Sequence, residues 1–299
     1  MPTLEGTYYP GTALDLYAWP QPAPHITMAP KRIKRTPTTR RERYNRSIAE
    51  RVALPSTPPT VTITLEKRME SSMRRVAHVW SARVRAGATT TYPSHLVAKI
   101  YDPVFFDDKE TKKYDPFEER DSGIAYEVES YRRLESLYET KVPRFYGYFA
   151  AMLPNQDSRT VFILLLEQVP GRDMCAIVPP KDAEKVCIKH KEAIVDAVLN
   201  LCADVYACGV NHQDMQPRNV ILRPQKHASL SLSRTRFCDT EECLLALEVD
   251  CEDLHMVLVD FEIVEFKVDP TYTEEPKRTE HIKSLKPLYL ECWLENGMV

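Results

Sequence analysis

The segment from His212 to Leu222 reads His-Gln-Asp-Met-Gln-Pro-Arg-Asn-Val-Ile-Leu, and it is the most informative stretch of the chain. It follows a stretch, Asp182 to Ala207, whose apolar residues recur at the helical period and which Gly209 is placed to end. Its last three residues are typical of a buried strand. We therefore expect a polar loop between a helix and a strand. A polar turn without any function would have a similar composition, so other segments have to agree with a functional interpretation.

Three acidic or amide side chains have the chemistry that phosphoryl transfer requires. The carboxylate of Asp214 can orient an attacking hydroxyl group or accept its proton, and the amide oxygen of Asn219, five residues later, can bind a magnesium ion. Asp260 follows the apolar run Val257 to Val259, where a carboxylate can hold magnesium against nucleotide phosphates. We therefore treat Asp214 as a candidate catalytic residue and the other two as candidate metal ligands.

Lys99 stands in the middle of an apolar strand, Leu96 to Ile100, where a charge is costly unless a partner lies nearby. The expected helix from Asp121 to Leu137 offers Glu127 on the face that carries its apolar residues. Glu129 is turned about 200° away at the helical period. We expect Lys99 and Glu127 to form a pair that positions phosphates. A surface ion pair with an edge-strand lysine is the alternative.

Taken in order, these segments resemble the protein-kinase-like phosphotransferases, and most closely the divergent kinase-like proteins of fungi that are related to aminoglycoside and choline kinases. The resemblance covers approximately Val61 to Phe266. It implies an α+β, two-lobed protein-kinase-like fold with a β-rich N-lobe and a mainly helical C-lobe. Only 37 residues follow Glu262, so the C-lobe looks truncated.

The resemblance also implies that the chain binds ATP and Mg²⁺. The stretch Leu164 to Gly171 resembles the hinge between the lobes, and the backbone groups of Glu167 and Val169 are then the candidates for binding the adenine ring. A buried strand that ends in a turn would have the same pattern. The resemblance gives cofactor-binding roles to Lys99, Glu167, Val169, Asn219 and Asp260, metal-binding roles to Asn219 and Asp260, and catalytic roles to Asp214, Lys99 and Glu127.

Several segments depart from the pattern of the family. The stretch Met69 to His78 contains no glycine where the family has a glycine-rich cover over the phosphates, although Ser71, Ser72 and Arg74 offer side-chain donors. Asp260 is followed by Phe and Glu in place of Phe-Gly, as in small-molecule kinases. Gln213 and Gln216 replace an arginine and a lysine of protein kinases, and no Ala-Pro-Glu element follows. Activation by phosphorylation and a complete peptide-binding platform are therefore not expected.

Composition separates the first 60 residues from the rest. They hold 10 of the 23 prolines and 9 Lys and Arg against 4 Asp and Glu. This favours a disordered basic arm over residues 1–60, a solvated tail or alternatively a nuclear-import or anion-contacting segment. The net charge of the whole chain is −3, so nucleic-acid binding is not expected apart from this arm. No membrane span or secretory signal is expected, which favours a cytoplasmic or nuclear protein without structural disulfides.

Residues 223–254 form an insertion between the two expected metal-binding elements. It contains Cys238, Cys243 and Cys251, followed by His255, and the gaps of 4, 7 and 3 residues between them lack the paired spacing of a zinc knuckle. We therefore favour a solvated acidic insertion over a metal site.

The predicted organisation is a basic arm over 1–60, an N-lobe over 61–169 and a C-lobe over 170–299. Short β-rich runs are expected at 61–65, 76–84, 96–100, 145–151 and 161–166. The favoured function is ATP- and Mg²⁺-dependent transfer of the γ-phosphoryl group to a hydroxyl acceptor, protein or small molecule. Two alternatives stay open: a pseudokinase that binds nucleotide or partners without efficient catalysis, and an unrelated structural α+β domain.

Overall fold

The chain divides into two units of structure, and each is described by itself. The structure is a computed structural model that describes residues 7–22, 36–69, 77–85, 92–224, 237–238, 240, 242–267 and 274–291. Unit 1 comprises Met1–Glu129 and Arg144–Gln168, and unit 2 comprises Ser130–Pro143 and Val169–Val299. The boundary at Gln168 lies one residue before the expected end of the N-lobe at Val169, and residues 130–143 belong to unit 2.

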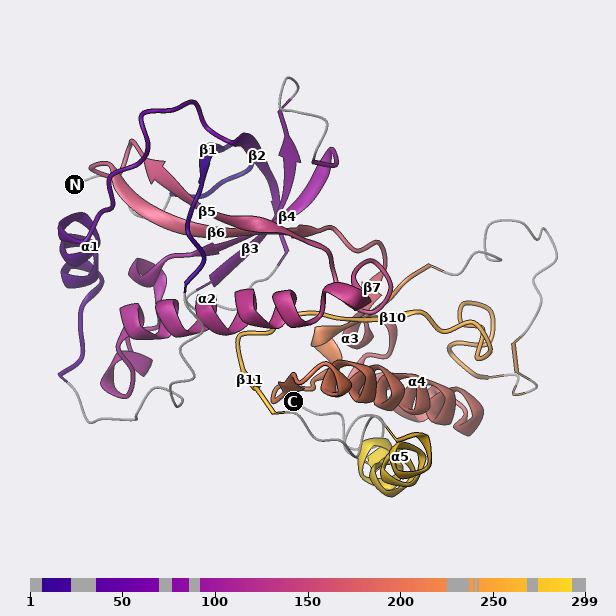
Figure 1. Cartoon of the computed structure of the whole chain (residues 1–299). Coiled ribbons are helices and arrows are strands. Elements are labelled where there is room, and N and C mark those ends of the chain that lie inside the picture. The colour runs from indigo at the N-terminus through magenta and orange to yellow at the C-terminus, as the bar shows by residue number, and fades with distance from the viewer. Residues whose placement is uncertain are drawn as a thin grey trace. The chain divides into compact units, whose positions relative to one another are not determined.

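Six antiparallel strands of unit 1 close into a barrel in the order β1-β2-β3-β4-β6-β5 (Figure 1). Their bounds are β1 Ala13–Ala18, β2 Val61–Arg68, β3 Ala77–Val84, β4 His95–Tyr101, β5 Phe145–Leu153 and β6 Arg159–Glu167. Along β2 the side chains of Val61, Ile63 and Leu65 are buried, and the intervening ones are half-buried. This period of two is what a strand with one inward face requires. All five strands predicted from the sequence are confirmed.

Helix α2, Pro116–Arg133, packs its apolar face against the strands of unit 1. Ile124 and Val128 lie in one buried cluster with Tyr101 of β4 and Leu164 of β6. The helix begins five residues earlier than predicted, where the Asp115 carboxylate accepts a hydrogen bond from the Phe117 N–H at 2.8 Å. Short 3₁₀ turns occur at Pro103–Phe105, Glu110–Lys112 and Glu135–Leu137.

The expectation of a disordered arm is wrong for residues 7–22 and 36–60. Strand β1 pairs with both β2 and β5, and the side chains of Leu14 and Leu16 are buried in the barrel. The first strand is therefore part of unit 1 and closes its sheet. The prediction weighed prolines and charges over the whole segment, and it passed over the short apolar alternation of Leu14 and Leu16.

Helix α1, Arg40–Ala49, corrects the same prediction in the basic stretch. Thr39 and Glu42 form a reciprocal capping box at its start. Arg43 is buried, and its guanidinium donates hydrogen bonds to the main-chain oxygen of Phe106 at 2.9 Å and to the Asp108 carboxylate at 2.6 Å. The guanidinium of Arg46 binds the Asp115 carboxylate at 3.0 Å. These arginines serve internal contacts of unit 1 and do not form a solvated tail.

Unit 2 contains three helices and two small sheets within the residues that the structure describes. The helices are α3 Met174–Ile177, α4 Ile188–Ala207 and α5 Glu275–Leu290, and a 3₁₀ turn covers Pro180–Lys185. One sheet has the order β10-β9-β7 and the other pairs β11 with β8. Their bounds are β7 Arg172–Asp173, β8 Asn211–His212, β9 Val220–Leu222, β10 Met256–Leu258 and β11 Val264–Glu265. Gly209, at φ 77°, follows α4 as predicted.

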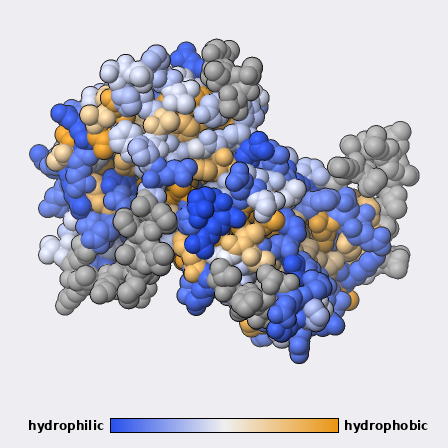
Figure 2. All heavy atoms as spheres, in the orientation of Figure 1, coloured by the Kyte–Doolittle hydropathy of each residue, from blue (hydrophilic) through white to orange (hydrophobic). Residues whose placement is uncertain are grey.

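The insertion departs from the expected solvated acidic segment wherever it is described. Between 242 and 254 it forms successive turns, and its buried side chains include Leu245, Ala246 and Val249. Leu244 and Leu247 are exposed, and Figure 2 shows hydrophobic side chains (orange) at the surface in this part of unit 2. The insertion therefore has an apolar side that packs within unit 2. Among the helices that the structure describes, none is long and apolar enough to cross a bilayer.

Candidate functional site

The predicted pair of Lys99 and Glu127 forms in unit 1. The ammonium nitrogen of Lys99 lies 2.7 Å from Oε2 of Glu127, and these side chains are 5% and 0% exposed. Lys99 is in the interior of β4, opposite Val79 of β3 and Leu164 of β6. An ammonium group held among apolar strands needs a compensating charge, and α2 supplies it. The alternative of a surface ion pair is wrong.

Tyr101 is a third member of this group that the sequence analysis did not identify. Its hydroxyl donates a short hydrogen bond to Oε2 of Glu127, the same oxygen that contacts Lys99. Tyr101 follows Lys99 by two residues on β4, so both side chains emerge from one face of the strand. That period of two was the available signal.

Glu129 differs from its prediction. The helical-phase argument correctly placed Glu127 inward, but Glu129 is also buried, at 4% exposed. Because α2 is covered on more than one side near its end, a rotation of about 200° does not bring this residue into solvent.

In unit 2, the loop after β8 brings Asp214 and Asn219 together. Nδ2 of Asn219 donates hydrogen bonds to the main-chain oxygen of Asp214 at 2.8 Å and to its Oδ2 at 3.1 Å. The Asp214 N–H donates to Nδ1 of His212 at 3.2 Å. The loop thus folds back on itself, which holds the Asp214 carboxylate against the Asn219 amide.

His212 is buried as a neutral imidazole. Burial lowers its pKa, and this effect outweighs the opposing influence of the Asp260 and Asp214 carboxylates. Nδ1 accepts from Asp214, so Nε2 carries the hydrogen and donates to the main-chain oxygen of Val259 at 3.2 Å. The His212 ring also meets the Phe261 ring edge-on, with centroids 5.2 Å apart. His212 therefore connects the loop to the segment that carries Asp260.

Asp260 has a left-handed backbone, at φ 70°, directly after β10 and Val259. The Val259 N–H donates to the main-chain oxygen of Asn219 at 2.9 Å. Val259, the residue before Asp260, thus accepts a hydrogen bond from His212 and donates one to Asn219. Phe261 is fully buried, which anchors the other side of Asp260, while the Asp260 carboxylate stays half-exposed. The geometry brings the three predicted residues of unit 2 into one neighbourhood.

Arg218 is a second residue that the sequence analysis missed. Its guanidinium donates to Oδ2 of Asp214 at 2.9 Å, and it also forms a short hydrogen bond with the Gln216 side chain. The sequence offered no signal for this contact, because the four-residue interval indicates a pair only on a helix and a loop was expected here. This contact fixes the orientation of the Asp214 carboxylate.

The residues predicted to bind adenine lie where β6 ends. The Glu167 N–H donates to the main-chain oxygen of Arg144 at 2.8 Å, and the Glu167 carboxylate accepts from the Arg144 N–H at 3.1 Å. The division between the units falls between Gln168 and Val169. Adenine binding by Glu167 and Val169 stays a prediction. Ser71, Ser72 and Arg74 lie outside the described residues.

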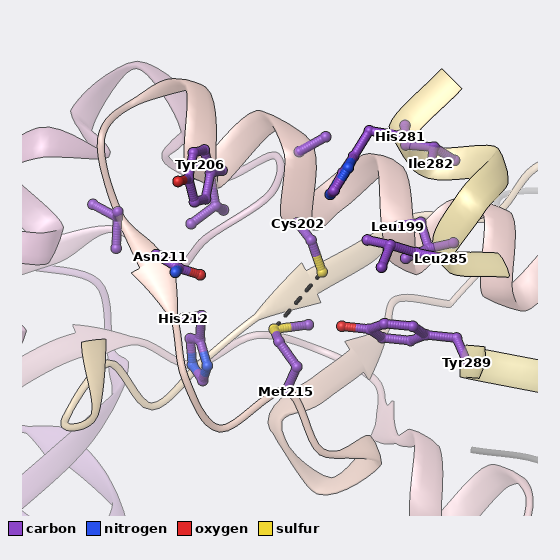
Figure 3. A pocket seen from close by; sticks show the side chains of 13 residues that line it. Leu199, Cys202, Tyr206, Asn211, His212, Met215, His281, Ile282, Leu285 and Tyr289 are labelled. Atoms are coloured by element: carbon purple, nitrogen blue, oxygen red, sulfur yellow. Dashed lines mark hydrogen bonds between the residues drawn. The ribbon is translucent and has the colours of Figure 1, made fainter. Parts of the chain in front are cut away.

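A pocket of about 310 Å³ lies behind the loop in unit 2 (Figure 3). Figure 3 shows His212 and Met215 of the loop facing residues of α4 and α5, among them Cys202 and Tyr289. The Cys202 thiol lies 3.7 Å from the Met215 sulfur, and burial raises its pKa to about 12. A neutral thiol and several apolar side chains thus line the pocket and support the loop from the side of the helices.

Comparisons with known proteins give only distant similarities. No family model and no curated protein matches the chain. The solved structure "WaaP in complex with acyl carrier protein" aligns with a TM-score of 0.41 and 14% identity, over 76% of this chain and 78% of that one. The "Crystal structure of BubR1 kinase domain" aligns with a TM-score of 0.43 and 10% identity, over 69% of this chain and 48% of that one. Neither similarity is strong enough to assign a function, which has to be inferred from this chain's own residues.

Proposed function

We propose that the chain transfers the γ-phosphoryl group of ATP to a hydroxyl group of an acceptor, with Mg²⁺ as cofactor. The observation that supports this most is the hydrogen-bonded group of unit 2, in which Asp214 and Asn219 contact each other and both His212 and Asn219 bind the residue before Asp260. It places a carboxylate suited to proton transfer beside two oxygen ligands suited to a hard cation.

Asp214 is the proposed base. Its carboxylate takes the proton of the acceptor hydroxyl while the hydroxyl oxygen forms a bond to the γ-phosphorus and the bond from that phosphorus to the β-bridging oxygen breaks. The products are the phosphorylated acceptor, ADP and a proton. Arg218 and Asn219 hold the carboxylate by hydrogen bonds at 2.9 and 3.1 Å, so it is oriented before the acceptor binds.

Asn219 and Asp260 are the proposed metal ligands, because they combine an amide oxygen with a carboxylate. Nδ2 of Asn219 donates to Asp214, so the amide oxygen of Asn219 is not used in these two hydrogen bonds. Mg²⁺ prefers such carboxylate and amide oxygens and, when bound, neutralises charge on the phosphates. In unit 1, Glu127 holds the Lys99 ammonium, which we propose interacts with the phosphates.

One observation favours the alternative of nucleotide binding without efficient catalysis. Oδ2 of Asp214 already accepts hydrogen bonds from Arg218 and Asn219, so an acceptor hydroxyl has to use the other carboxylate oxygen or displace one of these contacts. The two functions differ in turnover and share nucleotide binding.

A paired measurement on the full chain tests the proposal. We expect ATP with Mg²⁺ to raise the melting temperature and to be consumed in a Mg²⁺-dependent reaction. Asp214→Asn should lower turnover about 10²-fold and leave the ATP-dependent stabilisation nearly unchanged, because the lost interaction belongs to the transition state. Glu252→Gln, at an exposed position of unit 2, is the matched control.

The two readouts distinguish the outcomes. Stabilisation by ATP without turnover would replace the phosphotransferase with the nucleotide-binding alternative. The absence of both would contradict the proposal. Turnover that Asp214→Asn leaves unaltered would remove Asp214 from its role.

A further inference from the structure

Three thiols and one imidazole, none of them part of the candidate functional site, meet in unit 2. They are Cys187 and His190 at the beginning of α4, and Cys238 and Cys243 from the insertion between β9 and β10. One ligand atom of each residue lies within 4.8 Å of all the others. Figure 1 shows the insertion (orange) beside α4. Two segments that are 48 residues apart in sequence, from His190 to Cys238, thus contribute two potential ligands each.

The distances in this cluster match those around a tetrahedral metal ion. Nδ1 of His190 lies 3.2 Å from Sγ of Cys187 and 3.5 Å from Sγ of Cys243. A zinc ion with bonds of about 2.3 Å to sulfur and about 2.0 Å to nitrogen sets such ligands about 3.5 Å apart. The two distances from Nδ1 of His190 are therefore close to those of a tetrahedral site, and the remaining ligand atoms lie within 4.8 Å of one another.

A hydrogen bond of His190 presents the correct nitrogen to the thiols. Its Nε2–H donates to the main-chain oxygen of Val249 at 2.8 Å, so Nδ1 carries the lone pair and faces Cys187 and Cys243. Histidine ligands of zinc typically have their second nitrogen fixed in this way. Val249 belongs to the insertion, so this bond also connects the insertion to α4.

The cluster is shielded from solvent, and the helix end favours a thiolate at Cys187. His190, Cys238 and Cys243 are 0%, 5% and 7% exposed. Cys187 is the N-cap of α4, where the positive end of the helix dipole stabilises a negative sulfur, and its N–H donates to Sγ of Cys243 at 3.4 Å. Three soft ligands and one imidazole, without an acidic oxygen among them, are a donor set that selects zinc over magnesium.

The insertion has the kind of structure that a metal commonly organises. The part described between 242 and 254 contains turns and no helix or strand. Its internal backbone hydrogen bonds are mostly those of short turns, such as the one from the Ala246 N–H to the Cys243 oxygen at 3.1 Å, so a metal that joins it to a helix contributes to its folding free energy.

We propose that Cys187, His190, Cys238 and Cys243 bind a structural zinc ion that fastens the insertion to the beginning of α4. Four protein ligands complete a tetrahedral shell and leave no open position, so the ion has a structural role and no catalytic one. The site is independent of the proposed phosphotransferase function. Its donor set also differs from the cysteine group considered in the sequence: Cys251 and His255 are outside the cluster, and His255 pairs with Asp253 at 2.8 Å.

The experiment uses the full chain, produced with zinc in the medium and purified without chelators or a histidine tag. We expect about one zinc per chain by elemental analysis. Replacing the zinc with Co²⁺ should give thiolate-to-cobalt charge-transfer absorption in the near ultraviolet and the intense visible bands of tetrahedral cobalt. Cys238→Ser and His190→Ala should lose stoichiometric metal, whereas Cys251→Ser and Cys175→Ser, at cysteines outside the cluster, should retain it.

The cobalt titration of the unaltered chain keeps the test decisive if a variant fails to fold. A zinc content far below one per chain, together with a cobalt spectrum that lacks thiolate charge transfer, would overturn the proposal. So would a disulfide between two of the three cysteines in the freshly purified chain. Equal zinc loss from Cys238→Ser and Cys251→Ser would overturn the assignment of the ligands. None of these results depends on phosphotransferase activity.

Discussion

The ammonium of Lys99 and the carboxylate of Glu127 are each removed from water, so each depends on the other. Loss of one partner leaves a buried charge, which typically costs about 3–5 kcal/mol, whereas loss of both leaves two neutral groups. Tyr101 adds a hydrogen bond to the same carboxylate oxygen. The pair therefore behaves as one energetic unit and keeps the ammonium in a fixed position.

A double-mutant cycle tests this dependence. Lys99→Met and Glu127→Gln should each lower the free energy of unfolding by several kcal/mol, and the double mutant should lose less than the sum by about 2 kcal/mol or more. Denaturant titration measures all four proteins. If Lys99 also interacts with nucleotide, the losses of ATP binding should be non-additive in the same way.

The matched control is the pair of Lys113 and Glu110, which are 3.2 Å apart and exposed by 53% and 33%. Their coupling should stay below about 1 kcal/mol because solvent screens both charges. Glu129 is unsuitable as a control, since its side chain is buried. Equal coupling in both pairs would show that burial does not govern the Lys99 interaction.

At this scale the sequence was informative wherever a residue type conflicted with its surroundings. A lysine in an apolar strand demanded a partner, and the helical period selected Glu127 correctly. Tyr101 was missed although the period of two places it on the same strand face as Lys99, because a tyrosine in a strand does not require a charged partner; an arginine in a loop likewise does not indicate which residue it contacts. Their partners become visible only when the backbone brings the atoms together.

At the scale of elements, the short strand β7 is held beside β9 by a close backbone approach. Gly171, at φ 135°, precedes β7, and a Cβ atom at this position would lie 2.1 Å from the main-chain oxygen of Leu222. That separation is far below van der Waals contact. Strand β9 directly follows Asn219. The close contact between Gly171 and β9 therefore also supports the end of the loop that carries Asp214 and Asn219.

Gly171→Ala should therefore destabilise unit 2 by about 2 kcal/mol or more, because the strained φ and the clash act together. Gly11→Ala is the control: its φ is 96°, but a Cβ atom there meets nothing within 4 Å. The free energy of unfolding of this variant should fall by only about 1 kcal/mol, because only the backbone strain at the positive φ acts. Urea titration of both variants measures the difference. If both variants lost the same free energy of unfolding, the close contact between Gly171 and Leu222 would not contribute to stability.

Five of the six strands of unit 1 were predictable, because each of these five carries several apolar residues in a run bounded by turn-forming residues. The helix predicted over 182–207 is divided: a 3₁₀ turn ends at Lys185, and α4 begins at Ile188 after the N-cap Cys187. Periodicity alone does not reveal this break, since apolar residues continue through it. The position of Cys187 at the helix end, which the proposed zinc site depends on, was therefore not available from the sequence.

At the scale of the whole molecule, the N-terminal segment is part of the fold of unit 1. The Tyr8 hydroxyl donates to the Asp102 carboxylate at 2.8 Å, and Arg159 binds that carboxylate with two hydrogen bonds of 2.8 Å. Burial alone would raise the pKa of Asp102, but Arg159 and Tyr8 hold it below its usual value. A buried ionised carboxylate thus connects the N-terminal segment to β4 and β6.

The sequence favoured a mobile arm there for a physical reason that the fold reverses. Many prolines and basic residues reduce the apolar surface that a segment can bury by itself. Strand β1 needs to bury only Leu14 and Leu16, because β2 and β5 provide the rest of the core and the backbone partners. The alternation of Leu14 and Leu16 is too short a local signal to predict that the strand pairs with β2 and β5.

The role of β1 can be measured by removing it and by weakening it. Leu16→Ala, at a fully buried position of the barrel, should cost about 2–5 kcal/mol of unfolding free energy, whereas Tyr9→Ala, at a side chain 55% exposed, should cost less than about 0.5 kcal/mol.

Deleting residues 1–20 should abolish the cooperative unfolding of unit 1, because it leaves the edges of β2 and β5 unpaired and uncovers the core between them. Circular dichroism during denaturant titration and amide hydrogen exchange in β2 and β5 measure these effects. A mobile arm would give the opposite result: the deletion and both substitutions would leave the transition unchanged, and amides of β2 that donate to β1 would exchange at the same rate with and without the first 20 residues.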